Sequence, residues 1–300
     1  MQNLLNRLRA LGQDRVLENE PMSRHTTFRV GGAAEAVFLP ASSEEVLLAI
    51  SAAKECGVEY RVIGNGSNLL VKDGGLKGLT IILGEKYAEI RVEGARIAAQ
   101  AGAMLSRVSS AACEAGLSGL EFASGIPGTL GGGCAMNAGA YGGQLSDVLV
   151  SAEVLLEGEV KTLSRDELEM GYRTTLPLKK GGVVLSAVFE LKEDDREAIS
   201  ERMRDLNARR RDKQPLNMPS AGSTFKRPEG HFAGALIEGC GLKGFAIGGA
   251  QVSEKHAGFV VNTGDATAKD ILNLMKHVQD TVLREKGVLL EPEVRILGED

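Results

Sequence analysis

The segment 124–143 is the feature that most constrains how this chain can fold, because eight of its twenty residues are glycine. A glycine in an ordered element costs up to about 1 kcal/mol relative to alanine, so this density is not selected for stability. Apolar residues (Ile126, Pro127, Leu130 and Met136) are interleaved with the glycines, which argues against a flexible linker. The segment therefore predicts a backbone that closely approaches a diphosphate or a flat ring.

The composition excludes several classes of function. The 300 residues are 43% hydrophobic, which is enough for a substantial core in two or three domains. A net charge of −5 argues against a nucleic-acid or anionic-membrane partner, because both require a basic face. No apolar stretch is long enough to span a bilayer, and residues 1–15 have the pattern of an amphipathic helix rather than a signal peptide. A phosphorylated ligand would therefore need a local cluster of Lys and Arg.

The cysteines and histidines give little support for a metal site. Cys56, Cys113, Cys134 and Cys240 are widely spaced, with no CxxC pair and no histidine at ligand spacing, and the four histidines are equally scattered. We expect buried free thiols, no bound metal and a cytoplasmic location, where thiols stay reduced. The sequence does not fix the oligomeric state, and a monomer is compatible with it.

Hydrophobic periodicity and capping residues predict an α+β protein. Helices are expected over 42–57, in a short stretch between 164 and 172, over 195–212 and over about 267–286; the first two open with a capping-box spacing. Strands are expected at 60–63, 69–71, 79–83, 90–92, 96–99 and 293–296. Such short strands favour mixed or antiparallel pairing, and the loop between Pro215 and Pro219 indicates a domain boundary.

A second glycine turn, GNGSN at 64–68, follows the strand expected at 60–63. It does not fit a Rossmann fingerprint, because the chain continues into the apolar run at 69–71 instead of a helix, and no Walker Gly-Lys-Ser/Thr is present. Two interpretations remain open: an ordinary tight turn, or a turn that directs backbone N–H groups at an anion.

A third segment, 219–228, places a hydroxyl in a tight loop close to concentrated positive charge. The preceding run 209–211 is all arginine and is expected to be a solvated helix face. Lys213, Lys226 and Arg227 are expected in loops, where their geometry can be fixed around a phosphate.

Seven motifs, taken in order along the chain, are similar to those of one enzyme family. They are TFRVGG at 27–32, GNGSNLL at 64–70, GIPG at 125–128, MNAGAYG at 136–142, GYR at 171–173, AGSTFK at 221–226 and EPEVR at 291–295. Together they resemble the UDP-N-acetylenolpyruvoylglucosamine reductases, the UDP-N-acetylmuramate dehydrogenases of bacterial peptidoglycan synthesis. No single motif is decisive, but the resemblance runs from near residue 25 to the end of the chain.

The resemblance implies a three-domain flavoprotein of the vanillyl-alcohol-oxidase type. Residues 1–83 and 84–212 would form two FAD-binding subdomains, and 213–300 an α+β substrate-binding domain whose last strand returns to the active site. FAD would be bound non-covalently by the turn at 64–69 and the glycine-rich run. The implied cofactor-binding residues are Arg29, Gly64, Asn65, Gly66, Ser67, Asn68, Leu69, Gly125, Ile126, Gly132, Asn137 and Gly139.

The activity implied by the resemblance is reduction of the enolpyruvyl double bond of UDP-N-acetylglucosamine enolpyruvate to UDP-N-acetylmuramate, with NADPH as hydride donor through FAD. Hydride reaches C3, and the charge that builds at C2 must be stabilised and protonated. By resemblance, Ser223 is the proton donor, Arg173 the cation for the developing enolate, and Glu293 the glutamate that polarises the substrate or positions the donor. Candidates for holding the substrate or its diphosphate are Tyr172, Lys213, Arg227, Lys243 and Lys255.

The chain departs from part of the family after the Ser223 loop. Some members carry there an insertion with a tyrosine that folds over the substrate, whereas here Arg227 and Pro228 lead directly into the segment 229–237, as in the shorter subclass. Arg227 could take part of the missing role by pairing with phosphate. Two other functions remain open: an FAD-dependent oxidase or dehydrogenase of an alcohol or hydroxy acid, and a non-catalytic nucleotide-sugar binding protein.

Overall fold

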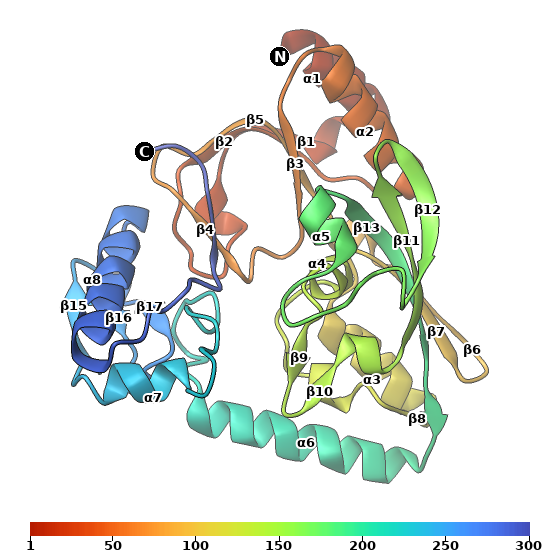
Figure 1. Cartoon of the computed structure of the whole chain (residues 1–300). Helices are drawn as coiled ribbons and strands as arrows, with labels where there is room; N and C mark the ends of the chain where they lie inside the picture. Colours follow the sequence, from red (N-terminus) through yellow and green to blue (C-terminus); the bar gives the residue numbers. More distant parts are fainter. The chain divides into compact units, whose positions relative to one another are not determined.

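Two units make up the structure, a computed structural model that describes all 300 residues (Figure 1). The first unit consists of Met1–Val16, Phe38–Asn65 and Ile81–Arg210. The second consists of Leu17–Val37, Gly66–Thr80 and Arg211–Asp300. Each unit is therefore built from segments that are distant in sequence.

A five-stranded antiparallel sheet forms the centre of the first unit. Its strand order is β12-β11-β13-β7-β6, with β6 at Ile90–Glu93, β7 at Arg96–Gln100, β11 at Leu149–Leu156, β12 at Glu159–Ser164 and β13 at Val183–Glu190. Helix α4 (Leu130–Ala135) packs on β13 and β7, and α3 (Leu105–Glu114) packs on β6 and β7. The glycine-rich run thus lies directly on the sheet.

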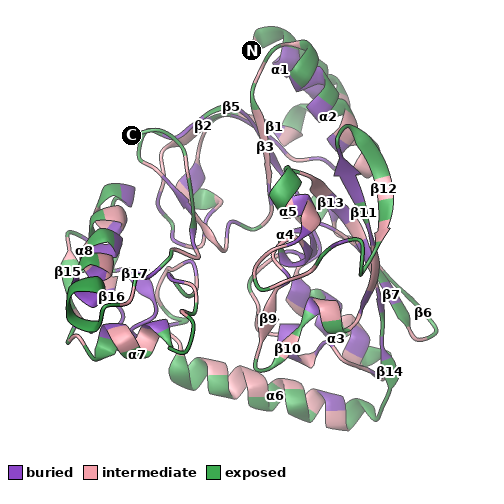
Figure 2. Cartoon of the chain, viewed as in Figure 1, coloured by how far each residue is buried: buried purple, intermediate pink, exposed green.

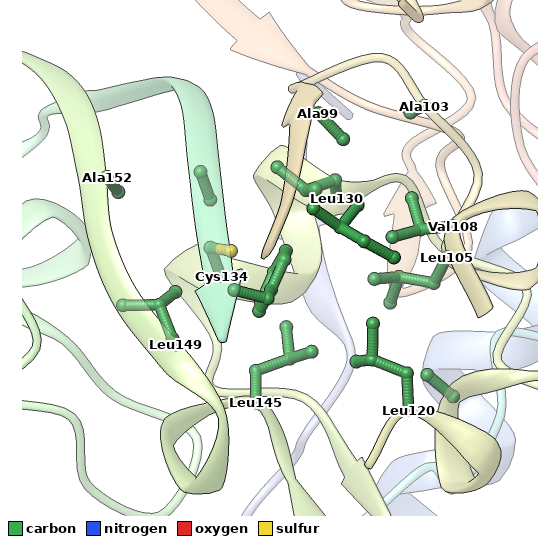
Figure 3. Close-up of a cluster of buried hydrophobic side chains, with 14 of the residues drawn as sticks. Ala99, Ala103, Leu105, Val108, Leu120, Leu130, Cys134, Leu145, Leu149 and Ala152 are labelled. Carbon is green, nitrogen blue, oxygen red and sulfur yellow. The ribbon is translucent and has the colours of Figure 1, made fainter. Parts of the chain in front are cut away.

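The core of the first unit lies between this sheet and the two helices. Figure 3 shows side chains from all of these elements meeting in one cluster, including Leu105, Leu130, Cys134, Leu145 and Leu149. Burial of Cys134 raises the pKa of its thiol to about 12. Removing this apolar surface from water is the main term that stabilises the unit.

The first unit also contains several shorter strands and further helices. They are α1 (Gln2–Leu11), α2 (Ser43–Glu55), β3 (Tyr60–Ile63), β8 (Leu117–Ser118), β9 (Gly139–Ala140), β10 (Gly143–Gln144), α5 (Leu176–Lys180), β14 (Lys192–Glu193) and α6 (Arg196–Lys213), whose last three residues fall in the second unit. Leu4, Leu5 and Leu8 of α1 are buried, and α1 packs on α2, so the expected amphipathic N-terminal helix is confirmed. Helix α6 buries only Ile199 and is mostly exposed or intermediate in Figure 2.

The second unit contains a small antiparallel sheet of order β15-β16-β17, formed by Ala246–Ile247, Ala250–Val252 and Val260–Asn262. Helix α8 (Ala268–Lys286) packs on all three strands and on α7 (Ala233–Glu238). The buried face of α8 includes Ile271, Leu274 and Val278, the apolar repeat expected from the sequence. In the same unit, β4 (Leu69–Val71) pairs in parallel with β18 (Arg295–Leu297). This pairing joins the segment Gly66–Thr80 to the end of the chain.

A further four-stranded sheet has the order β1-β2-β5-β3, with β1 at Val16–Pro21, β2 at Ala33–Phe38 and β5 at Leu76–Ile82. The division between the units falls within β1, β2 and β5. The α+β class is confirmed, and the pairing is mostly antiparallel, as expected. The division at Arg210–Arg211 lies close to the expected boundary at 212–213, whereas residues 83 and 84 both lie in the first unit, so the three-domain division stays a prediction.

Three sequence-based expectations need correction. Ser164 and Glu167 do form the reciprocal bonds of a capping box, but only one turn follows, because Glu169 adopts φ +47° and ends it. The last strand begins at Arg295 rather than Glu293. Lys213 is the final residue of α6 and not part of a loop.

All four cysteines are free, as expected, but only Cys134 is buried, and the other three are half-buried. No helix has the length and apolar character needed to span a membrane.

Candidate cofactor and substrate sites

The glycine turn after β3 packs tightly against the glycine-rich run within the first unit. A Cβ atom on Gly64 would lie 2.2 Å from Oγ1 of Thr129, so only glycine fits there without displacing the threonine. The side-chain amide of Asn65 donates to the carbonyl oxygen of Pro127 over 2.7 Å. The turn therefore packs closely against a second glycine-containing loop, and the choice between an ordinary tight turn and an anion-binding turn stays a prediction.

The hydroxyl of Thr129 lies in this contact and has no hydrogen-bond partner, although Thr129 is only 3% exposed. Thr129 is the N-cap of α4, yet its side chain makes no capping bond. A buried hydroxyl without a partner is uncommon, because its loss of hydration is not offset. The sequence alone does not distinguish Thr129, because a threonine before a short helix is ordinarily a helix cap.

The glycines of α4 divide into two kinds. Gly131 and Gly133 are buried, and a Cβ atom there would lie 2.7 Å from the Ala101 side chain and 2.8 Å from the Leu105 side chain, respectively. Gly132 between them is exposed, and its nearest neighbour would be Thr129 Oγ1 at 3.8 Å. Gly131 and Gly133 therefore allow α4 to pack closely on the core. The backbone at Gly132 stays accessible beside the unpartnered Thr129 hydroxyl.

This combination fits a phosphate-bearing cofactor such as FAD. The loops offer a buried hydroxyl that can donate, glycine backbone that allows close approach, and half-buried backbone at Gly125 and Ile126. Gly125 lies against α6, where its Cβ atom would be 2.6 Å from Asn207 and 3.0 Å from Arg210.

The expected solvated arginine face is only partly correct. Arg209 and Arg211 are exposed, whereas Arg210 is half-buried beside Gly125, and burial lowers the pKa of its guanidinium from the ordinary value. The sequence pattern of three consecutive arginines does not distinguish the middle one.

Asn137 and Gly139 form a support for Arg173, all within the first unit. The Arg173 guanidinium donates to the carbonyl oxygens of Asn137 and Gly139, each over 3.4 Å, and lies 5.1 Å from the centre of the Tyr172 ring. Arg173 adopts φ +55°, a left-handed conformation that is uncommon for a residue with a long side chain. Tyr172 is 57% exposed, so this pair offers an aromatic ring and a cation at the surface.

The Asn137 side chain is engaged with protein groups. Its Nδ2 donates to Ser146 and to the Gly171 carbonyl oxygen over 3.2 Å, and its Oδ1 accepts from the Ser146 amide over 3.0 Å. The bond to the Gly171 carbonyl oxygen ties buried Asn137 to the loop that carries Arg173.

In the second unit, the turn continues through Gly66 against the loop that carries Arg29. A Cβ atom on Gly66 would lie 2.1 Å from the His25 carbonyl oxygen, and the Gly66 carbonyl accepts from the Thr27 amide over 3.4 Å. Arg29 is exposed and has φ +56°. Ser67 is half-buried between Gly66 and Asn68.

Asn68 and Leu69 connect this turn to the C-terminal segment. The Asn68 side chain donates to the Glu293 carbonyl oxygen over 3.0 Å, the Arg295 amide donates to the Asn68 carbonyl over 3.0 Å, and Leu69 pairs with Arg295 in the parallel sheet. The chain end is thereby held at the same turn of the second unit.

Ser223 and Glu293 lie on neighbouring segments. Ser223 is exposed, and the residue after it, Thr224, accepts from the Glu293 amide over 2.9 Å at its carbonyl oxygen. One residue further on, Phe225 and Pro292 form an antiparallel bridge. The structure therefore brings Ser223 and Glu293 together, whereas Arg173 belongs to the first unit.

The basic residues suggested for the substrate differ in their surroundings. The ammonium of Lys243 pairs with Glu238 over 2.6 Å, and that of Lys255 donates to the Arg211 carbonyl oxygen. Lys213 is exposed at the end of α6. Arg227 is exposed, and its guanidinium lies 4.0 Å from the centre of the Phe232 ring. No group of three or more His, Cys, Asp or Glu side chains is arranged to hold a metal ion.

Comparison with known proteins agrees with this geometry. A family model of the FAD binding domain matches residues 34–164, and one of the UDP-N-acetylenolpyruvoylglucosamine reductase C-terminal domain matches residues 214–297. Part of the chain (64%) also resembles an alkyldihydroxyacetonephosphate synthase, at a TM-score of 0.50 and 18% identity, which is a likeness of fold alone. The fold and the matched FAD binding domain define an FAD-dependent oxidoreductase of the vanillyl-alcohol-oxidase type.

Closer relatives are similar over nearly the whole length. UDP-N-acetylenolpyruvoylglucosamine reductase of Agathobacter rectalis is 53% identical over 95% of this chain and 94% of its own, and that of Clostridium perfringens is 50% identical over 96% and 95%. The crystal structure of the reductase from Thermus caldophilus superimposes with a TM-score of 0.80 at 36% identity, covering 94% of this chain and 97% of that one. The chain belongs to the UDP-N-acetylenolpyruvoylglucosamine reductase family.

Proposed function

We propose that this protein reduces the enolpyruvyl double bond of UDP-N-acetylglucosamine enolpyruvate to give UDP-N-acetylmuramate, a peptidoglycan precursor, with NADPH as reductant. NADPH supplies a hydride and becomes NADP⁺. The hydride adds to C3, and a proton adds to C2 from a protein donor that regains it from solvent, so the carbon–carbon double bond becomes a single bond. Besides family membership, one structural observation supports this proposal: the segment that contains Ser223 pairs through its backbone with the segment that contains Glu293.

When bound, FAD supplies the two-electron transfer that links NADPH to the double bond. The residues proposed to hold it in the first unit are Gly64, Asn65, Gly125, Ile126, Gly132, Asn137 and Gly139, and in the second unit Arg29, Gly66, Ser67, Asn68 and Leu69. Thr129 is added to this set, because its buried hydroxyl lacks a protein partner and can donate to a phosphate oxygen. The support for Asn137 and Gly139 is indirect, since their carbonyl oxygens accept from Arg173.

Ser223 is proposed to give a proton to C2 as negative charge develops on that carbon. A serine hydroxyl is a poor acid in water, so this role requires a strongly basic carbon and fixed geometry. Ser223 is exposed, so a substrate can reach its hydroxyl. Backbone hydrogen bonds between its loop and the neighbouring segments hold the residue in place. Arg173 is proposed to stabilise the developing enolate, and Glu293 to polarise the substrate or to orient Ser223.

Tyr172, Lys213, Arg227, Lys243 and Lys255 are proposed to contact the nucleotide sugar. The strongest support is for Tyr172 and Arg227, because both are exposed and each pairs a cation with an aromatic ring: the Tyr172 ring lies beside the Arg173 guanidinium, and the Arg227 guanidinium lies beside the Phe232 ring. Lys243 and Lys255 would have to exchange their present partners for a phosphate, so their contribution is proposed to be smaller.

The proposed location is the cytoplasm, because four free cysteines suit a reducing compartment.

The test is NADPH oxidation by the FAD-loaded protein, with and without UDP-N-acetylglucosamine enolpyruvate, for the wild type and Ser223→Ala. We expect the sugar nucleotide to stimulate oxidation in the wild type. In Ser223→Ala, reduction of the flavin by NADPH should persist while sugar reduction falls by about 10²-fold or more, the usual contribution of a positioned proton donor. An unaffected sugar reduction in the variant would exclude Ser223 as the donor. A preparation that cannot be loaded with FAD would exclude the flavoenzyme.

A further inference from the structure

The loop that carries Ser223 lies along the free edge of a strand. Strand β17 is at the edge of the sheet β15-β16-β17, so the outer N–H and C=O groups of β17 have no partner within the sheet. The Asn262 amide donates to the Pro219 carbonyl oxygen over 2.9 Å, at one end of the loop. At the other end, Thr224 makes the bonds to the β17 side, and the pairing of Phe225 with Pro292 follows directly after it.

Thr224 uses three polar groups to do this. Its amide donates to the Gly258 carbonyl oxygen over 2.9 Å, and its hydroxyl accepts from the Val260 amide over 2.9 Å. Its carbonyl oxygen accepts from the Glu293 amide, also over 2.9 Å. Thr224 is 0% exposed, so these bonds are shielded from bulk water in the folded protein.

The side-chain bond has a role that the backbone cannot fill. Between Pro219 and Thr224 the loop departs from an extended conformation, with Gly222 at φ +74°. The Val260 amide therefore donates to the Thr224 hydroxyl and not to a carbonyl oxygen of the loop. The Thr224 hydroxyl takes the place of that carbonyl. Valine at this position would keep the shape of threonine but leave a buried N–H without an acceptor, which drives the loop to shift.

We propose that Thr224 is a positioning residue for the reaction: its hydroxyl holds the Ser223 backbone at a fixed place between β17 and Glu293. This inference rests on the proposed function, in which Ser223 is the proton donor. Thr224 itself needs no contact with substrate or cofactor. A displacement of about 1 Å at a reacting group can lower a rate by about 10²-fold, so a small shift of this loop is enough to be measured.

The variants Thr224→Val and Thr224→Ser separate the hydroxyl from the packing of the side chain. In the FAD-loaded protein, we expect Thr224→Val to lower the rate constant of sugar reduction by about ten- to a hundredfold while flavin reduction by NADPH keeps its wild-type rate. Binding of the sugar nucleotide, followed by the change it causes in the flavin spectrum, should also stay close to the wild type. Thr224→Ser keeps the hydroxyl and should restore sugar reduction.

Three results would overturn the proposal: wild-type sugar reduction in Thr224→Val, equal losses in both halves of the reaction, or a serine variant as impaired as the valine variant. If Thr224→Val does not fold, Thr224→Ala removes the same hydroxyl without a new methyl group and carries the same expectation. Measuring Ser223→Ala in the same assay separates the two proposals, the role of Ser223 as proton donor and the role of Thr224 as positioning residue. A loss in Ser223→Ala with none in Thr224→Val contradicts only the role of Thr224, and no loss in Ser223→Ala contradicts the role of Ser223.

Discussion

The amide of Glu293 donates a hydrogen bond to the carbonyl oxygen of Thr224 over 2.9 Å, and this bond sets the register between the Ser223 loop and the last segment of the chain. The next residues continue the pairing, with the Lys226 amide donating to the Glu291 carbonyl oxygen over 2.8 Å. Glu293 is therefore held by its backbone, independently of its side chain. Its carboxylate can be changed without removing the pairing.

Glu293→Gln should leave the fold and flavin reduction by NADPH intact and lower sugar reduction by about 10²-fold or more, because the amide removes the negative charge proposed to polarise the substrate or orient Ser223. Single-turnover measurement of each half of the reaction checks this. Glu299→Gln is the matched control in the same terminal segment, since the Glu299 carboxylate pairs with Lys77 in an exposed position and the substitution leaves its backbone bonds to Gly74 and Gly75 in place. Equal sugar reduction in the two variants would argue that Glu293 has no chemical role.

Thr129→Val should weaken FAD binding without weakening the apoprotein. A hydrogen bond to a charged phosphate contributes about 1.5–3 kcal/mol, which corresponds to roughly ten- to a hundredfold in the dissociation constant. In the apoprotein the variant removes a buried hydroxyl that has no partner, so its melting temperature should be unchanged or higher.

Fluorescence titration of apoprotein with FAD measures the first effect and thermal melting the second. Thr129→Ser retains the hydroxyl and should bind FAD like the wild type. Wild-type affinity in the valine variant would remove Thr129 from the cofactor site.

His256 should make the stability of the protein decrease as the pH falls. Burial lowers the pKa of His256, and its Nδ1 accepts from the Gly258 amide over 3.1 Å, so the folded state requires the neutral ring. Lys243 also opposes protonation, whereas Glu238 favours it. As the pH falls through the ordinary histidine value of about 6.5, the unfolded chain takes up a proton before the folded one, and unfolding becomes more favourable.

The variant His256→Asn keeps an acceptor near the position of Nδ1 but does not titrate. Between about pH 7.5 and about pH 5.5, its melting temperature should fall less than that of the wild type. His231→Asn, at an exposed histidine, should keep the wild-type slope. Identical slopes for wild type and His256→Asn would show that His256 is not the group responsible.

Asp73 should stabilise the start of α8. Its carboxylate oxygens accept from the amides of Ala268 and Lys269 over 2.9 and 3.0 Å, in addition to the capping box between Thr267 and Asp270. Asp73→Ala leaves these two amides to water and should cost about 1 kcal/mol, or roughly 2–4 °C in melting temperature. Asp280→Ala, which removes only an exposed ion pair within α8, should cost less; a larger loss there would contradict the assignment.

Long periodic elements could be predicted from the sequence, whereas single turns could not. Helix α8 is predictable because its apolar residues repeat at helical spacing over five turns, and the structure adds a threonine cap at its start and a glycine at its end. The capping box at Ser164 has no apolar repeat behind it, so nothing buries a continued helix, and the chain turns through Glu169 instead.

The candidate site was predictable only in part. The glycine density indicated close approach, but it could not separate Gly131 and Gly133, which pack on the core, from Gly64, which packs on Thr129. The unpartnered hydroxyl of Thr129 and the pairing of Thr224 with Glu293 are tertiary facts that no local pattern contains. Ser223, Arg173 and Glu293 came from family resemblance, because a lone serine, arginine or glutamate is ordinarily a surface residue.

The central claim is tested most directly by the visible flavin absorbance of the FAD-loaded protein under anaerobic conditions. One equivalent of NADPH should bleach the absorbance, and UDP-N-acetylglucosamine enolpyruvate added next should restore it while UDP-N-acetylmuramate forms in equal amount. Absorbance that stays bleached after the sugar nucleotide is added, or that NADPH never bleaches, would contradict the account.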